Sequence, residues 1–446
     1  MAEDDMDQLE HILSATATGF RASLYQHMPL SAYRNFNLWA LSPQNPFADT
    51  WREMMGLPQF AKLTLSLLGR SVAPSQWDAL VEHTTFMNAY LIYETISDNL
   101  AFGLAIPRDE DATFDARREI LYQFNNAMIA RLKGDRDQSD RLLVDIQRQC
   151  ETISGFEQSL THREQAQIVA AFVEQFPEYR AADIEYGTWN ALVANVQACA
   201  SLMEHMRGYR LESLVRQGLI RRYEAVNALL SKSVSDRQML QDVSIYSILV
   251  IPVLAYYIAV LTEMLGSTPR LGELLDNGVL VQALEDAALM VRLLNDLGTN
   301  LVVTDQFHRK LLDDLYTHLK SMHTPTAGFT DLLMRYSQDS TVMTRIRKDV
   351  SFGEFNVSLH NLTTSPATPL TLLLFGSNLV YFQKQYRECR QRLDTNLAII
   401  ARTLNSDTVS RLIHQFVGFH EHIYRNQFDD QAGDYATKPS LNLMTD

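Results

Sequence analysis

Cysteine is scarce in this chain of 446 residues, and the three copies lie far apart, at positions 150, 199 and 389. This spacing provides neither the ligand set of a zinc site nor a framework of paired disulfides. A chain without disulfides is typical of a reducing compartment, and the acidic first residues carry no signal-peptide pattern. We therefore expect a cytoplasmic protein.

Positive charge is also in deficit, with 39 lysines and arginines against 53 aspartates and glutamates and a net charge of −14. Because no basic stripe is available to neutralise phosphates, nucleic acid is not expected as a partner. The sequence also lacks a glycine-rich loop after a strand, an HExxH pair and a GxSxG nucleophile motif. These absences argue against dinucleotide, P-loop, HExxH zinc and serine-hydrolase sites.

Strand patterns are nearly absent, while apolar residues recur at helical spacing along most of the chain. The sequence therefore predicts an all-α fold with one large helical domain. We divide the chain into an N-terminal helix and aromatic strap over 1–58, the main helical domain over 59–426 and a polar tail over 427–446. One helix is expected to start at Val279 and to continue through Asn295 as far as Leu319.

Residues 243–262 form a run of twenty without a charge, which is long enough to span a bilayer. Pro252 lies in the middle of the run, and serines and tyrosines interrupt its apolar character. A helix that is apolar on all sides also occurs at the centre of large helical proteins. We favour this core helix over a transmembrane span.

Two short segments, 94–98 and 295–299, offer oxygen ligands at helical spacing. Glu94 and Asp98 are four residues apart, so both carboxylates are expected on one helix face, and Asn295 and Thr299 repeat this spacing. Such oxygens suit Mg²⁺, which also takes waters and substrate phosphates. The plainer alternatives are a solvated acidic face for the first segment and, for the second, a helix end stopped by the glycine at 298.

The first segment resembles the aspartate-rich DDxxD motif of the class I terpene synthases. Glu94 stands for the first acid, Thr95 for the second, and Asp98 is intact at the fifth position. Apolar residues flank these acids on both sides, which favours a position that lines a cleft over a solvated face.

The second segment is similar to NDxx(S/T)xxxE, the other metal motif of the same family. Residues 291–299 match its first half, including an arginine and leucines before Asn295. The acid expected at the ninth position is replaced by Val303, and Asp305 needs a local helix distortion to take its place. The two departures indicate a divergent member of the family.

The resemblance implies a terpenoid-synthase-like helical bundle around a central apolar cleft. There, two or three Mg²⁺ ions, or Mn²⁺ in their place, hold the diphosphate of an allylic isoprenoid. The implied reaction is ionisation and cyclisation of farnesyl diphosphate, or of geranylgeranyl diphosphate, with release of diphosphate by a monomer or homodimer. The implied catalytic metal ligands are Glu94, Asp98, Asn295 and Thr299, with Asp305 as a further ligand.

Other residues are candidates for holding the two ends of such a substrate. The candidate diphosphate-binding residues are Arg292, Lys384, Tyr386, Arg387 and Arg425. The candidate lining of the apolar pocket, where aromatic faces stabilise cation character, is Phe86, Tyr90, Tyr93, Phe102, Tyr246 and Tyr256. For each of these side chains the alternative is an ordinary surface cation or core ring. The family also has a break in a central helix upstream of its second motif, and Pro252 is expected to kink the chain there.

Two other functions stay open. A squalene- or phytoene-synthase-like prenyl transferase joins two isoprenoid diphosphates and carries two DxxxD-type motifs, the second of which is poorly matched here. A helical binding protein that kept the fold without the metals would release no diphosphate.

Overall fold

The computed structural model describes residues 3–426, apart from residues 102, 235, 267 and 304 and the segments 105–112, 151–152, 154–161, 232–233, 322–327 and 338–340. Within these described residues the chain is helical, without a strand and with one isolated bridge between Gly328 and Pro366. The predicted all-α class is confirmed. Phe102 and the tail 427–446 lie outside the described residues, as does the side chain of Asp305.

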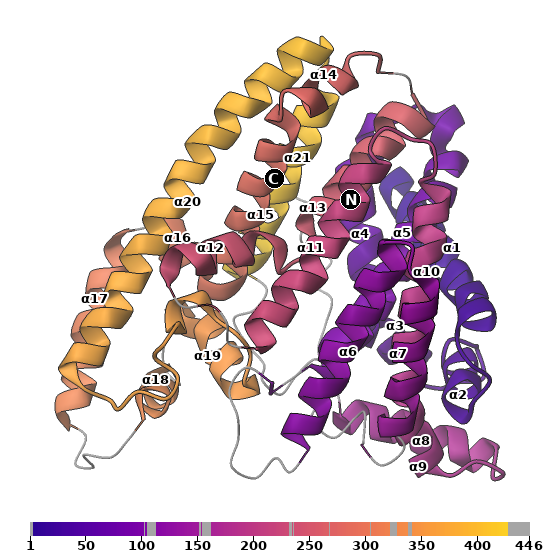
Figure 1. The fold of residues 1–446 in the computed structure, drawn as a ribbon, viewed down its shortest axis with the longest axis horizontal. Helices are drawn as coiled ribbons and strands as arrows, with labels where there is room; N and C mark the ends of the chain where they lie inside the picture. Colours follow the sequence, from indigo (N-terminus) through magenta and orange to yellow (C-terminus); the bar gives the residue numbers. More distant parts are fainter. Residues whose placement is uncertain are drawn as a thin grey trace.

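The helices of the first half of the chain gather on one side of the molecule (Figure 1). Their bounds are α1 (Glu3–His27), α2 (Ala32–Ala40), α3 (Ala48–Met54), α4 (Leu57–Leu68), α5 (Trp77–Leu100), α6 (Phe114–Leu132), α7 (Arg136–Gln149), α8 (His162–Gln175), α9 (Ala181–Glu185), α10 (Asn190–His205) and α11 (Glu212–Leu230).

The second half of the chain forms the other side, where the long helix α20 runs along the outer edge (Figure 1). Its helices are α12 (Arg237–Tyr246), α13 (Val250–Ala259), α14 (Leu271–Asp276), α15 (Val279–Leu297), α16 (Thr299–Val303), α17 (Asp305–Ser321), α18 (Phe329–Ser337), α19 (Thr344–Phe352), α20 (Pro369–Leu404) and α21 (Thr408–Asn426). Because α13 packs against α11 on one side and α15 on the other, it joins the two halves.

The aromatic strap predicted before residue 58 folds into α2 and α3 and the start of α4. It packs on α1 and α8 in a hydrophobic cluster separate from the main core. Phe36 lies at its centre, with ring centroids 5.1 Å from Trp51 and 5.6 Å from Phe172 in edge-on contact. Edge-to-face ring pairs of this kind stabilise a core beyond the area that they bury.

Helix α5 lies between these two cores and is apolar on both faces. Tyr93 and Ile96 belong to the N-terminal cluster, while Tyr90 and Leu91 belong to the main core. A helix packed on two sides carries most residues of its middle turns into the protein, and residues 87–94 of α5 are all buried. This is why Glu94, a charged residue, lies in the interior.

The uncharged run 243–262 is divided between α12, α13 and a π-helical turn, Val260–Met264. α12 ends at Tyr246 and α13 begins at Val250, with Pro252 in its first turn, where no helical hydrogen bond is lost. The break therefore lies a few residues before the position predicted from Pro252. Every residue of α13 is buried, as predicted for a core helix.

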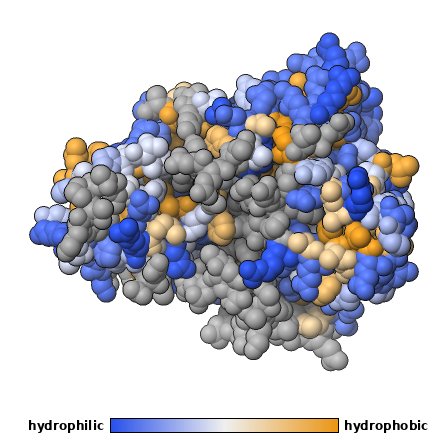
Figure 2. Space-filling view, turned by 90° about the horizontal axis from the view of Figure 1, so that it is seen from below, coloured by the Kyte–Doolittle hydropathy of each residue, from blue (hydrophilic) through white to orange (hydrophobic). Residues whose placement is uncertain are grey.

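Within the described residues, the stretch Arg237–Met264 is the one candidate that length and composition mark as able to cross a membrane. Of its most apolar window, 72% is buried inside the protein, so it is weak evidence for a span. On the face shown in Figure 2, the described residues are mostly hydrophilic, with small separated hydrophobic patches. No clear transmembrane span is present in this part of the chain.

The helix predicted to run from Val279 to Leu319 is wrong in its length. α15 ends at Leu297, and Gly298 leaves the helical region with φ 79° and ψ 155°. The positive φ favours glycine, which stops the helix even though the apolar pattern continues beyond it. α16 and α17 then follow as separate helices.

Candidate functional site

Glu94 is held in a buried polar network on the face of α5 that packs against α10. Its Oε1 accepts two hydrogen bonds of 2.6 Å, one from the Tyr223 hydroxyl and one from the Asn195 side-chain amide. The hydroxyls of Tyr90 and Tyr223 are 2.7 Å apart. Burial raises the pKa of Glu94, and the nearby charge of Arg222 opposes this rise. Glu94 is thus fixed by its neighbours.

Arg222 on α11 lies beside both acids of the first motif. Its Nη2 is 3.4 Å from Asp98 Oδ1 and 3.9 Å from Glu94 Oε2. Only 11% of the Arg222 side chain is accessible to water, compared with 67% of the Asp98 side chain. The protein packed around Asp98 raises its pKa, but access of water limits this effect and Arg222 opposes it. Asp98 is therefore the open acid of the pair.

The side chains of the second motif are already engaged within the protein. Because the helix stops at Gly298, Asn295 and Thr299 do not share one helix face, and the alternative interpretation as a helix end is correct. Asn295 Oδ1 accepts a hydrogen bond of 2.7 Å from Arg345. The Thr299 hydroxyl donates one of 2.6 Å to the backbone oxygen of Glu421.

Asp296 lies between Asn295 and Thr299 in the sequence, is fully buried and accepts a hydrogen bond from Arg292. Its Oδ2 accepts hydrogen bonds from Arg292 Nη2 at 3.0 Å and from the backbone N–H of Val357 at 2.9 Å. Arg292 also donates to the backbone oxygen of Phe355 at 3.2 Å. Its Nε is buried without a hydrogen-bond partner among the described residues. Arg292 therefore keeps an unused donor.

Helix α19 adds two cations that the sequence analysis did not identify. Lys348 Nζ is 2.6 Å from Glu354 Oε2, and the Arg345 guanidinium is 5.0 Å from the centroid of the Tyr424 ring. Burial raises the pKa of Glu354 to about 7, although the Lys348 charge opposes the rise. No sequence motif marks these residues, since tertiary packing alone places them beside α15.

Arg222 was also missed, although a signal for it exists. Val215 and Leu219 of α11 are fully buried, and Arg222 lies three residues after Leu219 on the same face of the helix. A charged residue on an apolar helix face points to a buried partner. In this protein the partners are Glu94 and Asp98.

The two predicted motifs lie on opposite sides of one region. The positive charges of Arg292 and Lys348, which belong to the second half of the chain, lower the pKa of Asp98 on α5. A Cβ added to Gly103, just after α5, would lie 4.0 Å from the backbone oxygen of Phe352 at the end of α19. We refer to Glu94, Asp98, Arg222, Arg292, Arg345 and Lys348 as the charged site.

The oxygens of the charged site suit one divalent cation held by the first motif better than several ions shared by the two motifs. Asp98 is open, and Oε2 of Glu94 accepts no hydrogen bond among the described residues. Asn295 and Thr299 already have partners, and Val303 is 43% exposed. In the described part of the chain, no group of three or more His, Cys, Asp or Glu side chains could hold a metal. The ion count of two or three remains a prediction.

Most other diphosphate-binding candidates have different surroundings. Lys384 is exposed and pairs with an acid of its own helix, and Arg387 and Arg425 are also exposed. The Tyr386 hydroxyl is buried and donates to the Glu421 carboxylate. From this set, Arg292 is the residue whose charge acts on Asp98.

The candidate aromatic residues point in several directions. Tyr90 belongs to the Glu94 network, but Tyr93 packs towards α1 against Phe20, with ring centroids 5.0 Å apart. Phe86 is 38% exposed. The Tyr246 and Tyr256 hydroxyls are occupied by hydrogen bonds outside the charged site. Tyr90 is therefore the one pocket candidate that the described contacts link to Glu94.

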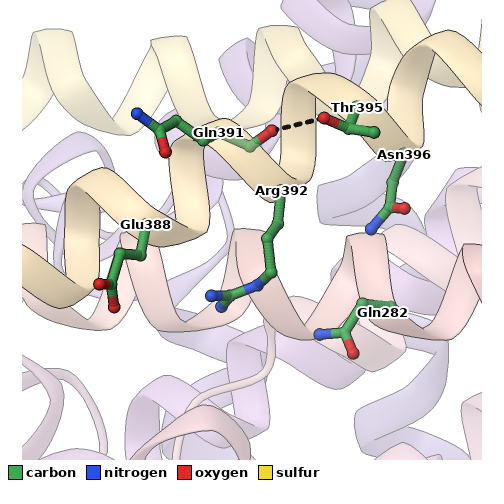
Figure 3. A pocket seen from close by; sticks show the side chains of 6 residues that line it. All are labelled: Gln282, Glu388, Gln391, Arg392, Thr395 and Asn396. Atoms are coloured by element: carbon green, nitrogen blue, oxygen red, sulfur yellow. Dashed lines mark hydrogen bonds between the residues drawn. The ribbon is translucent and has the colours of Figure 1, made fainter.

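Two open grooves lie away from the charged site. One, of about 440 Å³, is formed by polar residues of α15 and α20, including Gln282 and Arg392 (Figure 3). Gln282 precedes Asn295 by 13 residues, which corresponds to about 20 Å along the helix. The other groove, of about 430 Å³, lies between α1 and α5 and includes Glu82 and Phe86.

No family model, no curated protein and no solved structure matches this chain.

Proposed function

We propose that this protein binds the diphosphate group of an allylic isoprenoid at the charged site and promotes its ionisation and cyclisation with release of diphosphate. Farnesyl diphosphate is the favoured substrate, with geranylgeranyl diphosphate as the longer possibility. The observation that carries this proposal is the position of Arg222, whose Nη2 lies 3.4 Å from Asp98 Oδ1 and 3.9 Å from Glu94 Oε2, with the charges of Arg292 and Lys348 also acting on Asp98. Charged side chains from both halves of the chain thus act on one solvent-accessible carboxylate, that of Asp98. A ligand site formed between the two halves requires this arrangement.

The arginines and the lysine have a direct role in this proposal. Charge develops on the diphosphate oxygens as the carbon–oxygen bond breaks, and preorganised donors in a site of low polarity stabilise that charge. Arg222 and Arg292 are largely buried, and the Nε of each lacks a partner among the described residues. Both guanidinium groups thus lie in surroundings of low polarity, where a fixed positive charge stabilises developing negative charge more strongly than it does in water.

A charge count explains why a divalent cation belongs to the proposal. The four cations of the region, Arg222, Arg292, Arg345 and Lys348, face five acids. These acids are Glu94, Asp98, Asp296, Asp349 and Glu354. The region is thus not positive by itself, and Mg²⁺ beside Asp98 and Glu94 would supply the missing charge when bound. Mn²⁺ has the same preference for oxygen ligands.

One observation favours a second candidate function, a binding protein without catalysis. The Asn295 and Thr299 side chains are used inside the protein, so the second motif offers no free ligand in this arrangement. A protein of this kind would bind an isoprenoid diphosphate and leave it intact.

Diphosphate release separates these possibilities. The full chain is incubated with C10, C15 and C20 allylic diphosphates and Mg²⁺, and released diphosphate and extracted hydrocarbons are measured. Asp98→Asn should reduce release at least about 100-fold, the effect of removing one key electrostatic group. The matched control is Asp313→Asn on α17, where the aspartate is exposed to solvent.

Each outcome has a distinct meaning. A cyclic product supports the cyclase, and a linear product joined from two substrates supports the prenyl transferase. Saturable binding of the substrate without release supports the binding protein. If wild-type protein neither binds nor cleaves any of the three substrates, the proposed function is wrong.

A further inference from the structure

Two histidines from different helices meet beside the groove between α1 and α5. His83 lies in the first half of α5, and His205 is the last residue of α10. The His83 Nδ1 and His205 Nε2 atoms are 3.1 Å apart, and both rings are partly accessible to solvent. Neither residue belongs to the charged site. The proposed function therefore leaves this pair unexplained.

Neighbouring groups hold the His205 ring and the backbone that carries His83. The Phe86 ring stacks on His205 with centroids 4.1 Å apart and an interplanar angle of 12°. The Tyr256 hydroxyl donates a hydrogen bond of 2.5 Å to the backbone oxygen of His83. Burial lowers the pKa of each histidine, which favours the neutral imidazole that binds metal ions.

The separation of the nitrogens matches shared coordination of one ion. Imidazole nitrogens lie about 2.0–2.1 Å from Zn²⁺. For two such bonds, the 3.1 Å between His83 Nδ1 and His205 Nε2 corresponds to an N–metal–N angle of about 100°. This angle lies between those of square-planar and tetrahedral sites, which are the common geometries for Cu²⁺ and Zn²⁺.

We propose that His83 and His205 together bind one divalent transition-metal ion of the Zn²⁺ and Cu²⁺ class. Within the described residues no third His, Cys, Asp or Glu completes a cluster, so water fills the remaining coordination positions. Imidazole prefers such ions to Mg²⁺, so this site is chemically separate from the oxygen ligands at Asp98. The ion links α5, which carries Glu94, to α10, which carries the Asn195 that holds it.

Zinc titration with a competing chromophoric indicator tests this proposal on the full chain. Wild-type protein should bind one equivalent of Zn²⁺ that is lost in His83→Gln and in His205→Gln. In each variant the affinity should fall at least about tenfold, the loss found even for changes outside the ligand shell. Glutamine can keep a hydrogen bond to the remaining imidazole but is a poor zinc ligand, so folding and metal binding are tested separately. Copper EPR should show two coupled nitrogens in wild type only.

The matched control removes a histidine from elsewhere on the surface. His414 on α21 is exposed, and His414→Gln should keep the equivalent of Zn²⁺. Asp98→Asn should keep it too, since that change affects only the proposed diphosphate site. If the double variant His83→Gln/His205→Gln binds as much Zn²⁺ as wild type, or wild type binds none, the pair is a hydrogen bond and the proposal is wrong.

Discussion

The pairing of Arg222 with Glu94 makes a quantitative prediction about stability. In Arg222→Met, the buried Glu94 carboxylate keeps its hydrogen bonds from Tyr223 and Asn195 but loses its positive partner. In Glu94→Gln, the amide oxygen can still accept both hydrogen bonds and the negative charge is gone. The double variant removes both charges. These three proteins and wild type form a double-mutant cycle for one buried pair.

The expected penalty follows from the distance between the two charged groups. At 3.9 Å and an effective dielectric constant of about 20, the attraction is about 4 kcal/mol. Burying the Arg222 charge costs free energy, and the substitution removes this cost, so the net penalty is smaller than the lost attraction. We therefore expect Arg222→Met to lose about 3 kcal/mol of unfolding free energy. The exposed partner Asp98 adds little, because solvent screens it. Glu94→Gln should cost about 1 kcal/mol, and the double variant should recover about 2 kcal/mol of the sum.

Urea unfolding followed by circular dichroism measures these differences, and pH adds a second test. The folded pKa of Glu94 is raised above its ordinary 4.5, so the folded state holds its proton more tightly than the unfolded state. Loss of Arg222 raises that pKa further. The Arg222→Met penalty should therefore grow as pH rises through the folded wild-type pKa of Glu94, which lies above 4.5. The pairing would be refuted if the losses in Arg222→Met and Glu94→Gln add up to the loss in the double variant within about 0.5 kcal/mol. A penalty for Arg222→Met that does not change with pH would refute it too.

Three further predictions concern the second half of the site and its ligands. Gly298→Ala should cost about 1–2 kcal/mol of unfolding free energy, because alanine is strained at φ 79°; an unchanged melting temperature would contradict this. The pKa of Glu354 is raised to about 7, so wild-type stability should fall as pH rises from 4.5 through 7, and Glu354→Gln should flatten that slope in unfolding measurements. Mg²⁺ and diphosphate should bind with positive coupling, each raising the affinity of the other by the same factor. In calorimetry Mg²⁺ alone should give little heat. Tight Mg²⁺ binding without diphosphate would contradict the predicted coupling between the two ligands.

The helical class and the core position of α13 could be predicted from the sequence, because both depend on local periodicity. The apolar residues that flank Glu94 and Asp98 favoured a position lining a cleft, and the structure places the neighbouring Tyr90 and Tyr93 in different cores. Gly298 was recognised as a possible stop, yet the spacing of Asn295 and Thr299 favoured a continuous helix. The positive φ of the glycine, which ends the helix, outweighed that spacing.

The partners of the predicted acids could not be read from the sequence. Asn195 and Tyr223 are 101 and 129 residues from Glu94, and no local pattern specifies which buried donors reach a given carboxylate. Arg345 and Lys348 lie on a short helix after segments without a motif. Their importance depends on the packing of α19 against α15, which is a property of the tertiary structure.

The structure gives the two acids of the first motif different environments, and this difference bears on how the site can work. Glu94 accepts two short hydrogen bonds and lies beside Arg222, so it orients that arginine. The hydroxyl of Thr95, which stands where the family has an acid, is used within the helix by donating to the backbone oxygen of Leu91 at 3.1 Å. Asp98 is then the one acid of the motif with open oxygens. We infer that the proposed site takes one metal ion rather than several, because a single open carboxylate cannot hold several ions.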